Sequence, residues 1–344
     1  MLGERAGLLC VLLVLGHIHL AFAGLLSPWS GPRWRATATC QASERSTRKA
    51  WHVLSPTEKA AYIQADLCLM QKPPKAFLDV EGIQNIWDEL QYLHILLANV
   101  IHDVGGALPW HRLFVHTHEY LQKTECGYQG TQPYWDEQFD QGIGLNHSPI
   151  FDPVTGFGQN GQGDDNCVLD GPFANMTLHV SGNGPQDYCL SRKFDPDSFT
   201  LGNITYVEEC MSMQNYSSAF PCWFLNPHIA GHWGVGGTML DVIASPGDPV
   251  FYLHHANLDR LWWGWQVRDL PDRLWDMAGN NVPSDEALEI NGFPPVSQES
   301  IDGFGDPGNV TTLRHILNMG GIVPNRTILE VMDIRNQFLC YEYA

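Results

Sequence analysis

Histidines at helical spacing, followed by an adjacent histidine pair, constrain this chain more than any other feature. His228 and His232 are four residues apart. Because an α-helix has ~3.6 residues per turn, both imidazoles leave the same face and can reach one ion. A second apolar and aromatic-rich segment carries His254 and His255, and Asp259 follows one turn later. The pattern predicts two helices that contribute ligands to one metal ion.

The second of these helices has a typical start and a limited ligand face. Asp248 followed by Pro249 is a common helix N-terminus, and an apolar run follows it. His254 and His255 lie about 100° apart on such a helix, so only one of them is expected to point into the shared space. Asp259 lies on the face of His255, where a carboxylate can orient an imidazole from behind.

Residue types restrict the metal but do not identify it. Two ordinary amphipathic helices with core or surface histidines are the alternative, yet three histidines and a carboxylate at these offsets favour a metal site. Between His228 and His232 stands Ile-Ala-Gly, so the glutamate that serves zinc proteases with a His-Glu-x-x-His motif is missing. An all-imidazole ligand set suits copper, zinc, iron or nickel.

The first half of the chain supplies three further histidines in a helical context. Ser55 and Glu58 form a capping box that starts one helix, and apolar spacing predicts a second helix over about 80–97 and a third over about 110–123. These two helices and the Gly-Gly turn between them carry His94, His102 and His111. Six histidines in one bundle make a dinuclear site the simplest arrangement. The predicted fold is mainly α, a four-helix bundle around that site, with long loops and a few short β-strands between about 167 and 206.

The N-terminal 23 residues have the pattern of a secretory signal. Arg5 precedes an apolar core over 8–15, and a small-x-small cleavage pattern stands before Gly24. The apolar core is far shorter than the ~20 residues of a membrane-spanning helix. We therefore expect residues 24–344 to form one domain that is secreted or held in secretory vesicles.

Composition after that segment fits an oxidising compartment. Eight cysteines remain, an even number that predicts disulfides whose connectivity the sequence leaves open. N-glycosylation sequons stand at Asn146, Asn175, Asn203, Asn215, Asn309 and Asn325. The formal net charge of −19 argues against nucleic acid and anionic membrane surfaces as partners. The oligomeric state is left open.

Two multi-residue motifs resemble the copper-binding regions of fungal tyrosinases and catechol oxidases, the type-3 copper family. The first is His94-x7-His102-x8-His111 with the later stretch Gln-Pro-Tyr-Trp over 132–135. The second combines His228-x3-His232 with Asp-Pro-x-Phe-x-x-His-His over 248–255, followed by Asp-Arg. The resemblance extends from about Cys40 to Tyr343, nearly all of the chain after the predicted signal.

The resemblance implies a ligand set and an activity. His94, His102 and His111 would bind one copper ion, and His228, His232 and His255 the other, with His254 a neighbour. Phe251 would pack over the site and Val242 would narrow its entrance. The remaining histidines match no ligand position and are expected to be structural or on the surface: His52, His116, His118, His147, His179 and His315. With O2, such enzymes oxidise o-diphenols to o-quinones, and some hydroxylate monophenols, in pigment or secondary-metabolite biosynthesis.

Departures from the family pattern favour diphenol oxidation. Ile229 stands where many monophenol-active relatives carry Asn, and Ala219 stands near the place of a water-holding Glu. Val100 replaces a cysteine that is thioether-linked to the second histidine in many relatives. At the other end, Tyr341-x-Tyr343 resembles the marker that closes the catalytic domain, so a short form without a C-terminal lid domain is expected.

Other functions remain open from the residues alone. Within the enzyme class these are an o-aminophenol oxidase and a phenol-coupling tailoring enzyme. From other classes they are a haemocyanin-like dioxygen carrier, which uses much the same six histidines, and a zinc-loaded or metal-free binding protein.

Overall fold

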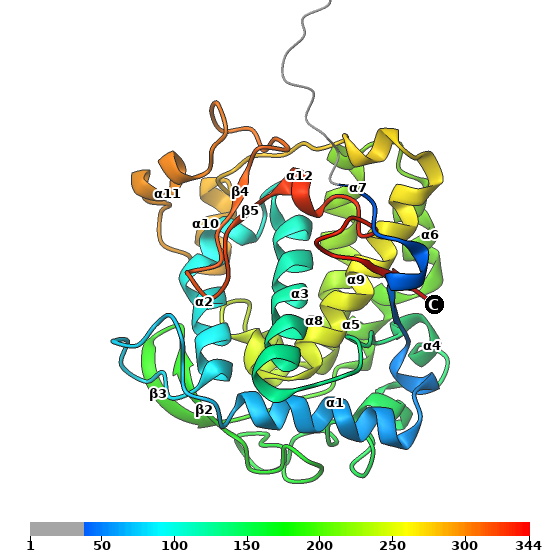
Figure 1. Cartoon of the computed structure of the whole chain (residues 1–344). Helices are drawn as coiled ribbons and strands as arrows, with labels where there is room; N and C mark the ends of the chain where they lie inside the picture. Colours follow the sequence, from blue (N-terminus) through cyan, green and yellow to red (C-terminus); the bar gives the residue numbers. More distant parts are fainter. Residues whose placement is uncertain (1–37) are drawn as a thin grey trace, which may run out of the picture. The chain divides into compact units, whose positions relative to one another are not determined.

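Long helices organise the part of the chain that the computed structural model describes, residues 38–344 (Figure 1). Helices α2 (Ile86–Ile101), α3 (Ala107–Cys126) and α9 (Val250–Gln266) pack side by side. The helical run that ends in α8 (Ile229–Val235) completes the bundle against α9. The predicted mainly α, four-helix arrangement is confirmed. The predicted signal segment, residues 1–23, lies outside the described residues.

Local sequence explains where the first helices begin. Helix α1 (Pro56–Leu69) starts at the predicted capping box, in which the Ser55 side chain accepts from the Glu58 backbone amide. The prediction that α2 begins near residue 80 is wrong by about two turns. Gly82 has φ of 91°, which a right-handed helix cannot contain, and the Asn85 side chain caps the helix only at Ile86. Helix α3 begins directly after the Gly-Gly turn, three residues earlier than predicted.

A break in helical geometry precedes α8. Helix α7 (Tyr216–Trp223) continues through a π-helical turn, Phe224–His228, into α8. Pro221 and Pro227 lie inside this run, and because proline has no amide hydrogen, the regular helical ladder cannot pass through it unchanged. His228 is the last residue of the π turn and His232 lies one turn later in α8.

Short strands and short helices fill the loops around the bundle. The predicted strand region contains one antiparallel hairpin, β2 (Thr177–Ser181) with β3 (Gly184–Cys189). Beyond it the prediction is wrong, because Asp195 and Asn203 side chains cap helices. The other short elements are α4 (Glu137–Asp140), α5 (Pro196–Phe199), α6 (Ile204–Ser212), α10 (Asp285–Asn291), α11 (Gln298–Gly303), α12 (Ile328–Val331), β4 (Ile316–Leu317) and β5 (Arg326–Thr327). Strand β1 (Ser46–Arg48) pairs in parallel with β6 (Tyr341–Tyr343). Within residues 38–344, no helix has both the length and the apolar character needed to cross a membrane.

Four disulfides cross-link the segments around the bundle. They join Cys40 to Cys340, Cys68 to Cys126, Cys167 to Cys189 and Cys210 to Cys222. The first closes a loop of 300 residues, and the second joins α1 to the end of α3. Cross-links of this kind restrict the unfolded chain and so stabilise the fold. All eight cysteines predicted to remain after the signal are paired.

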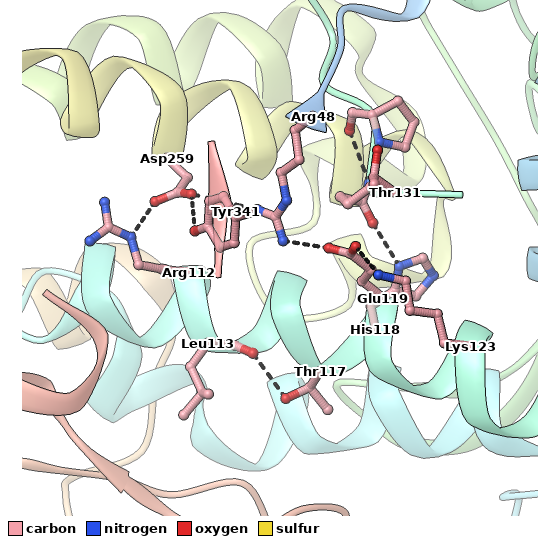
Figure 2. A network of polar contacts seen from close by, with 12 residues as sticks. Arg48, Arg112, Leu113, Thr117, His118, Glu119, Lys123, Thr131, Asp259 and Tyr341 are labelled. Carbon is pink, nitrogen blue, oxygen red and sulfur yellow. Dashed lines mark hydrogen bonds and ion pairs between the residues drawn. The ribbon is translucent and has the colours of Figure 1, made fainter. Parts of the chain in front are cut away.

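A buried polar network fastens the C-terminal strand to the two longest helices (Figure 2). The Arg48 guanidinium on β1 donates to the Glu119 carboxylate of α3 at 2.7 Å. The hydroxyls of Tyr341 and Tyr343 both donate to one oxygen of Asp259 on α9, at 2.5 and 2.6 Å. The Tyr-x-Tyr pair therefore anchors β6 directly to the helix that carries His255.

Candidate metal centre

Three histidines from α2, α3 and the turn between them form the first group. His94 lies on α2, His102 directly follows it, and His111 lies in the second turn of α3. All three are buried, and their candidate ligand atoms lie within 4.8 Å of one another. The three histidine side chains therefore meet at one point, because the Gly-Gly turn reverses the chain between the two helices.

Backbone carbonyls fix the orientation of this first group. The Nδ1 atoms of His94, His102 and His111 lie 2.7, 2.9 and 2.8 Å from the carbonyl oxygens of residues 243, 98 and 107. A carbonyl oxygen can only accept, so each Nδ1 carries the proton and each Nε2 carries a free lone pair. This is how proteins commonly orient metal-binding imidazoles.

The second group comes from the π turn, α8 and α9. His232 donates from Nδ1 to the Met239 carbonyl at 2.7 Å, and its Nε2 lies 3.2 Å from Nε2 of His255. His228 has no hydrogen-bond partner on either ring nitrogen among the described residues, although it is only 6% exposed. These three side chains converge as the sequence predicted.

His254 also lies in this group, which contradicts the expectation that only one member of the pair faces the shared space. Its candidate ligand atom is within 4.8 Å of those of the other three histidines. The ring of His232 lies close to both members of the pair, with centroids 4.8 Å from His254 and 5.4 Å from His255. Gly231 permits this approach, because a Cβ there would lie 2.1 Å from Nδ1 of His254. A difference of about 100° on the helix is too small to turn one ring away.

Glu137 is a site residue that sequence reasoning missed. Its carboxylate on α4 lies 2.6 Å from Nδ1 of His254, and both side chains are fully buried. Burial raises the pKa of Glu137 well above its usual value, against the opposing effect of the nearby Asn257 amide. The only signal in the sequence was an acidic residue directly after the Tyr-Trp-Asp stretch, and the helical spacing of the histidines does not point to it. The contact fixes the orientation of the His254 ring.

Burial keeps the histidines of both groups neutral. It lowers the pKa of His94, His111, His228, His232 and His255 well below the usual value, and the neighbouring histidines lower it further. The pKa of His102 falls to about 4, mainly through burial. Neutral imidazoles have the lone pairs that metal binding requires.

The donor set fits two metal ions. The Nε2 atoms of His94, His111 and His228 are buried without a hydrogen-bond partner among the described residues. A buried polar atom without a partner is costly, and a bound cation removes that cost. Neither group includes a thiolate or a carboxylate, so the ligands are of the type that suits copper.

Phe251 and a stacked ring pair join the two groups. The rings of His111 and His255 stack with centroids 4.3 Å apart. The Phe251 ring contacts the first group at His94, 5.3 Å away, and the second at His255, 4.2 Å away. Phe251 therefore lies against both groups, in the packing position that the family resemblance implies.

A cavity of about 310 Å³ opens onto the histidines. Ile229 and Val242 line it, together with His102, His228 and His232. Val242, which was expected at the entrance, and Ile229, which was expected beside the phenol, thus both line the cavity. Ala219 is buried and is not among the lining residues. Four large apolar side chains that line the cavity are also strongly exposed at the surface: Leu225, Trp233, Leu240 and Ile290.

Asp259 takes a different role from the one expected. It does not orient His255 in the structure: Arg112 binds one carboxylate oxygen and Tyr341 binds the other (Figure 2). The hydroxyl of Tyr343 donates to that second oxygen as well. Helical spacing correctly placed Asp259 on the same helix face as His255. Residues 112 and 341 are too remote in sequence for this pattern to show that they bind the carboxylate instead. The residue therefore anchors α9 and acts on His255 only through the helix.

Two other expectations concern residues near the ligands. Val100 is buried, and the eight cysteines of residues 38–344 are all in disulfides, so none there can form a thioether with His102.

Among the histidines predicted to be structural, His118 is buried against Asp66 at 3.0 Å, and His315 lies 2.7 Å from Asp306. His147 is exposed.

Comparison with known proteins agrees with this geometry. Residues 84–268 match the family described as the common central domain of tyrosinase. The chain is 35% identical to tyrosinase-like protein phomQ1' of Diaporthe leptostromiformis, over 94% of this chain and 87% of that one. It is 30% identical to N-acetyl-6-hydroxytryptophan oxidase ivoB of Emericella nidulans, over 88% and 93%.

A solved structure shows the same architecture. The polyphenol oxidase of Thermothelomyces thermophila, in its G292N mutant form, superposes with a TM-score of 0.72 at 26% identity, covering 89% of this chain and 91% of that one. The matched family segment contains all six histidines of the two predicted triads. The chain belongs to the tyrosinase family of copper oxidoreductases.

Proposed function

We propose that this chain oxidises o-diphenols to o-quinones with O2 at two copper ions. His94, His102 and His111 would bind one ion, and His228, His232 and His255 the other. The observation that carries the proposal is the convergence of two buried groups of neutral histidines, with unpartnered Nε2 atoms, at the inner end of one cavity. The Emericella relative is itself named as an oxidase of a hydroxylated tryptophan.

The protein's part in the reaction is to hold the ligands and to shape a dry, apolar entrance. The two triads would hold copper ions, which would supply the place for O2 and the route for electrons from the diphenol. Ile229, Val242 and Phe224 present apolar surface to an aromatic ring that enters the cavity. Phe251 is fully buried against both groups and excludes water between them. Two diphenols lose four electrons and four protons in total, and one O2 takes them up as two waters.

Ile229 supports diphenol oxidation over monophenol hydroxylation. Its side chain lines the cavity beside His228 and has no group that could hydrogen-bond a water near the phenol hydroxyl. A diphenol needs less help, since it only has to lose electrons and protons to the bound oxidant. We therefore propose weak hydroxylation of monophenols.

We also propose that the protein passes through the secretory pathway. The four disulfides support this, since such bonds persist in oxidising compartments. Asn146, Asn175, Asn215, Asn309 and Asn325 are exposed and so accessible for glycosylation. A mass shift on treatment with an N-glycosidase would test it.

Oxygen uptake and quinone absorbance with 4-methylcatechol test the proposed activity. We expect both signals from protein loaded with two copper equivalents and neither from protein loaded with zinc. His228→Gln should lose at least about 100-fold in turnover, because the second triad loses a ligand. The matched control, His147→Gln, changes an exposed histidine and should retain activity.

Two results would contradict the proposal. Copper-loaded protein that binds O2 reversibly without forming quinone would instead be a dioxygen carrier. Copper-loaded protein that binds neither O2 nor catechol would be a binding protein of another kind.

A further inference from the structure

The cavity that opens onto the neutral histidines has one side chain with a formal charge in its lining, and that side chain is acidic. Asp103, directly after His102, contributes a carboxylate to the wall. Its other lining residues are histidine, apolar and aromatic side chains, and the amide of Asn291. A ligand that enters this space therefore meets a single negative group against an apolar surface.

The chain segments around the opening add no positive charge. Residues 224–243, which supply one side of the cavity, include no lysine or arginine, and neither do residues 284–303 on the other side. Helix α10, which contributes Ala287, Ile290 and Asn291 to the lining, also carries Asp285, Glu286 and Glu289. Low-dielectric walls concentrate such a field at the opening, which attracts cations and repels anions.

Asp103 is held so that its carboxylate stays available. Its backbone has φ of 54°, a left-handed conformation that Asp and Asn adopt more readily than most residues. The Asn291 side-chain amide donates to Oδ2 at 2.9 Å and also to the Ala287 carbonyl, which ties the residue to α10. Among residues 38–344 no hydrogen bond reaches Oδ1. One carboxylate oxygen is thus fixed and the other is free to accept.

Aromatic and unpartnered polar groups complete the environment. Trp233 and Phe224 line the same cavity, and Trp233 is 51% exposed. An indole face attracts an ammonium group within about 6 Å. His228, unpartnered on both ring nitrogens and 6% exposed, marks the inner end where the reacting ring is held.

We propose that this entrance selects phenols that carry an ammonium group, and that Asp103 is the residue that selects them. The inference rests on the proposed function, since it names the substrate class of the same site. The phenol ring lies toward the histidines, and its ammonium group pairs with Oδ1 of Asp103. A phenol with a free carboxylate meets repulsion from the same oxygen.

Two catechols of similar size and opposite charge test the selection. We expect the copper-loaded enzyme to show a higher kcat/KM for dopamine than for 3,4-dihydroxyphenylacetate, and the ratio to fall as salt is raised. Asp103→Asn should lower the ratio about tenfold, because one partly exposed charge pair is lost and one repulsion is removed. Asp103→Gly, which also tolerates the left-handed backbone, should lower it similarly. The matched control, Asp165→Asn, removes an exposed charge outside the lining and should leave the ratio unchanged.

A binding measurement on metal-free protein gives a readout that does not need turnover. Calorimetry should detect tighter binding of 2-phenylethylamine than of phenylacetate, and Asp103→Asn should remove the difference. Equal kcat/KM values for the two catechols, or a ratio that Asp103→Asn and Asp103→Gly leave unchanged, would overturn the selection while leaving the oxidase proposal intact. Absence of turnover with every catechol would overturn the oxidase proposal, and the calorimetry would then decide the selection alone.

Discussion

Single side chains at the cavity decide which reaction the site favours. Ile229 follows a candidate ligand directly and faces the substrate space, so a change there alters the chemistry near the phenol without removing a histidine. Asp103 occupies the equivalent position after His102. The residues that follow ligands in sequence thus line the entrance, because the backbone that points a histidine inward brings its neighbour to the cavity wall.

Ile229→Asn should raise monophenol hydroxylation relative to diphenol oxidation. The amide can hold a water beside the phenol hydroxyl and help to remove its proton, which is worth a factor of at least about 10. The measurement is the ratio of initial rates on 4-methylphenol and 4-methylcatechol. Ile229→Leu, which keeps the apolar surface, is the matched control. A ratio for Ile229→Asn that stays within about twofold of the control would show that deprotonation does not limit hydroxylation.

Whole elements place the ligands, and the anchors of those elements lie outside the histidine groups. Arg48 on β1 binds Glu119 on α3, and Asp259 on α9 binds Arg112 and Tyr341 of β6 (Figure 2). Glu119 is only 5% exposed at its side chain. Burial alone would raise its pKa, but Arg48 and Lys123 outweigh that effect and lower the pKa to about 2.

Stability should therefore decline in acid as Glu119 gains a proton. A carboxylate with a lowered folded-state pKa contributes stability above its unfolded value of 4.5, and the contribution is lost as pH falls toward about 2. The shift corresponds to about 3 kcal/mol. Glu119→Gln should lower the free energy of unfolding at pH 7, measured with urea, and the gap to wild type should shrink below pH 4. The exposed Glu81→Gln serves as control; a gap that is independent of pH would contradict the ion-pair account.

At the scale of the whole molecule, two distant stretches build one site. His94 to His111 and His228 to His255 each form a local motif, and for that reason the sequence could predict that the histidines gather in two groups, together with the helices and the bundle. Features that depend on contacts between distant residues could not be predicted. These include the pairing of Cys40 with Cys340, the attachment of Asp259 to Arg112, and the contact of Glu137 with His254. The predicted helix boundaries were wrong where a glycine or a capping side chain overrode the apolar pattern, as at Gly82.

Because His254 lies among the candidate ligands of the second group, the identity of the metal ligands is the question to test. Four histidines, and not three, lie within reach of the second position, with Glu137 holding Nδ1 of His254. An imidazole tied to a buried carboxylate by one nitrogen can still offer the other to a metal. Sequence resemblance assigns His255 to the ion, and the geometry of the side chains leaves both rings close to it.

A crystal structure of the copper-loaded protein, with copper located by anomalous scattering, tests the central claim most directly. We expect two copper ions, one bound by Nε2 of His94, His102 and His111 and the other by His228, His232 and His255, close enough for one O2 to bridge them. A single copper ion, or two ions too far apart to share O2, would contradict the account. So would a second ion held by His254 in place of His255.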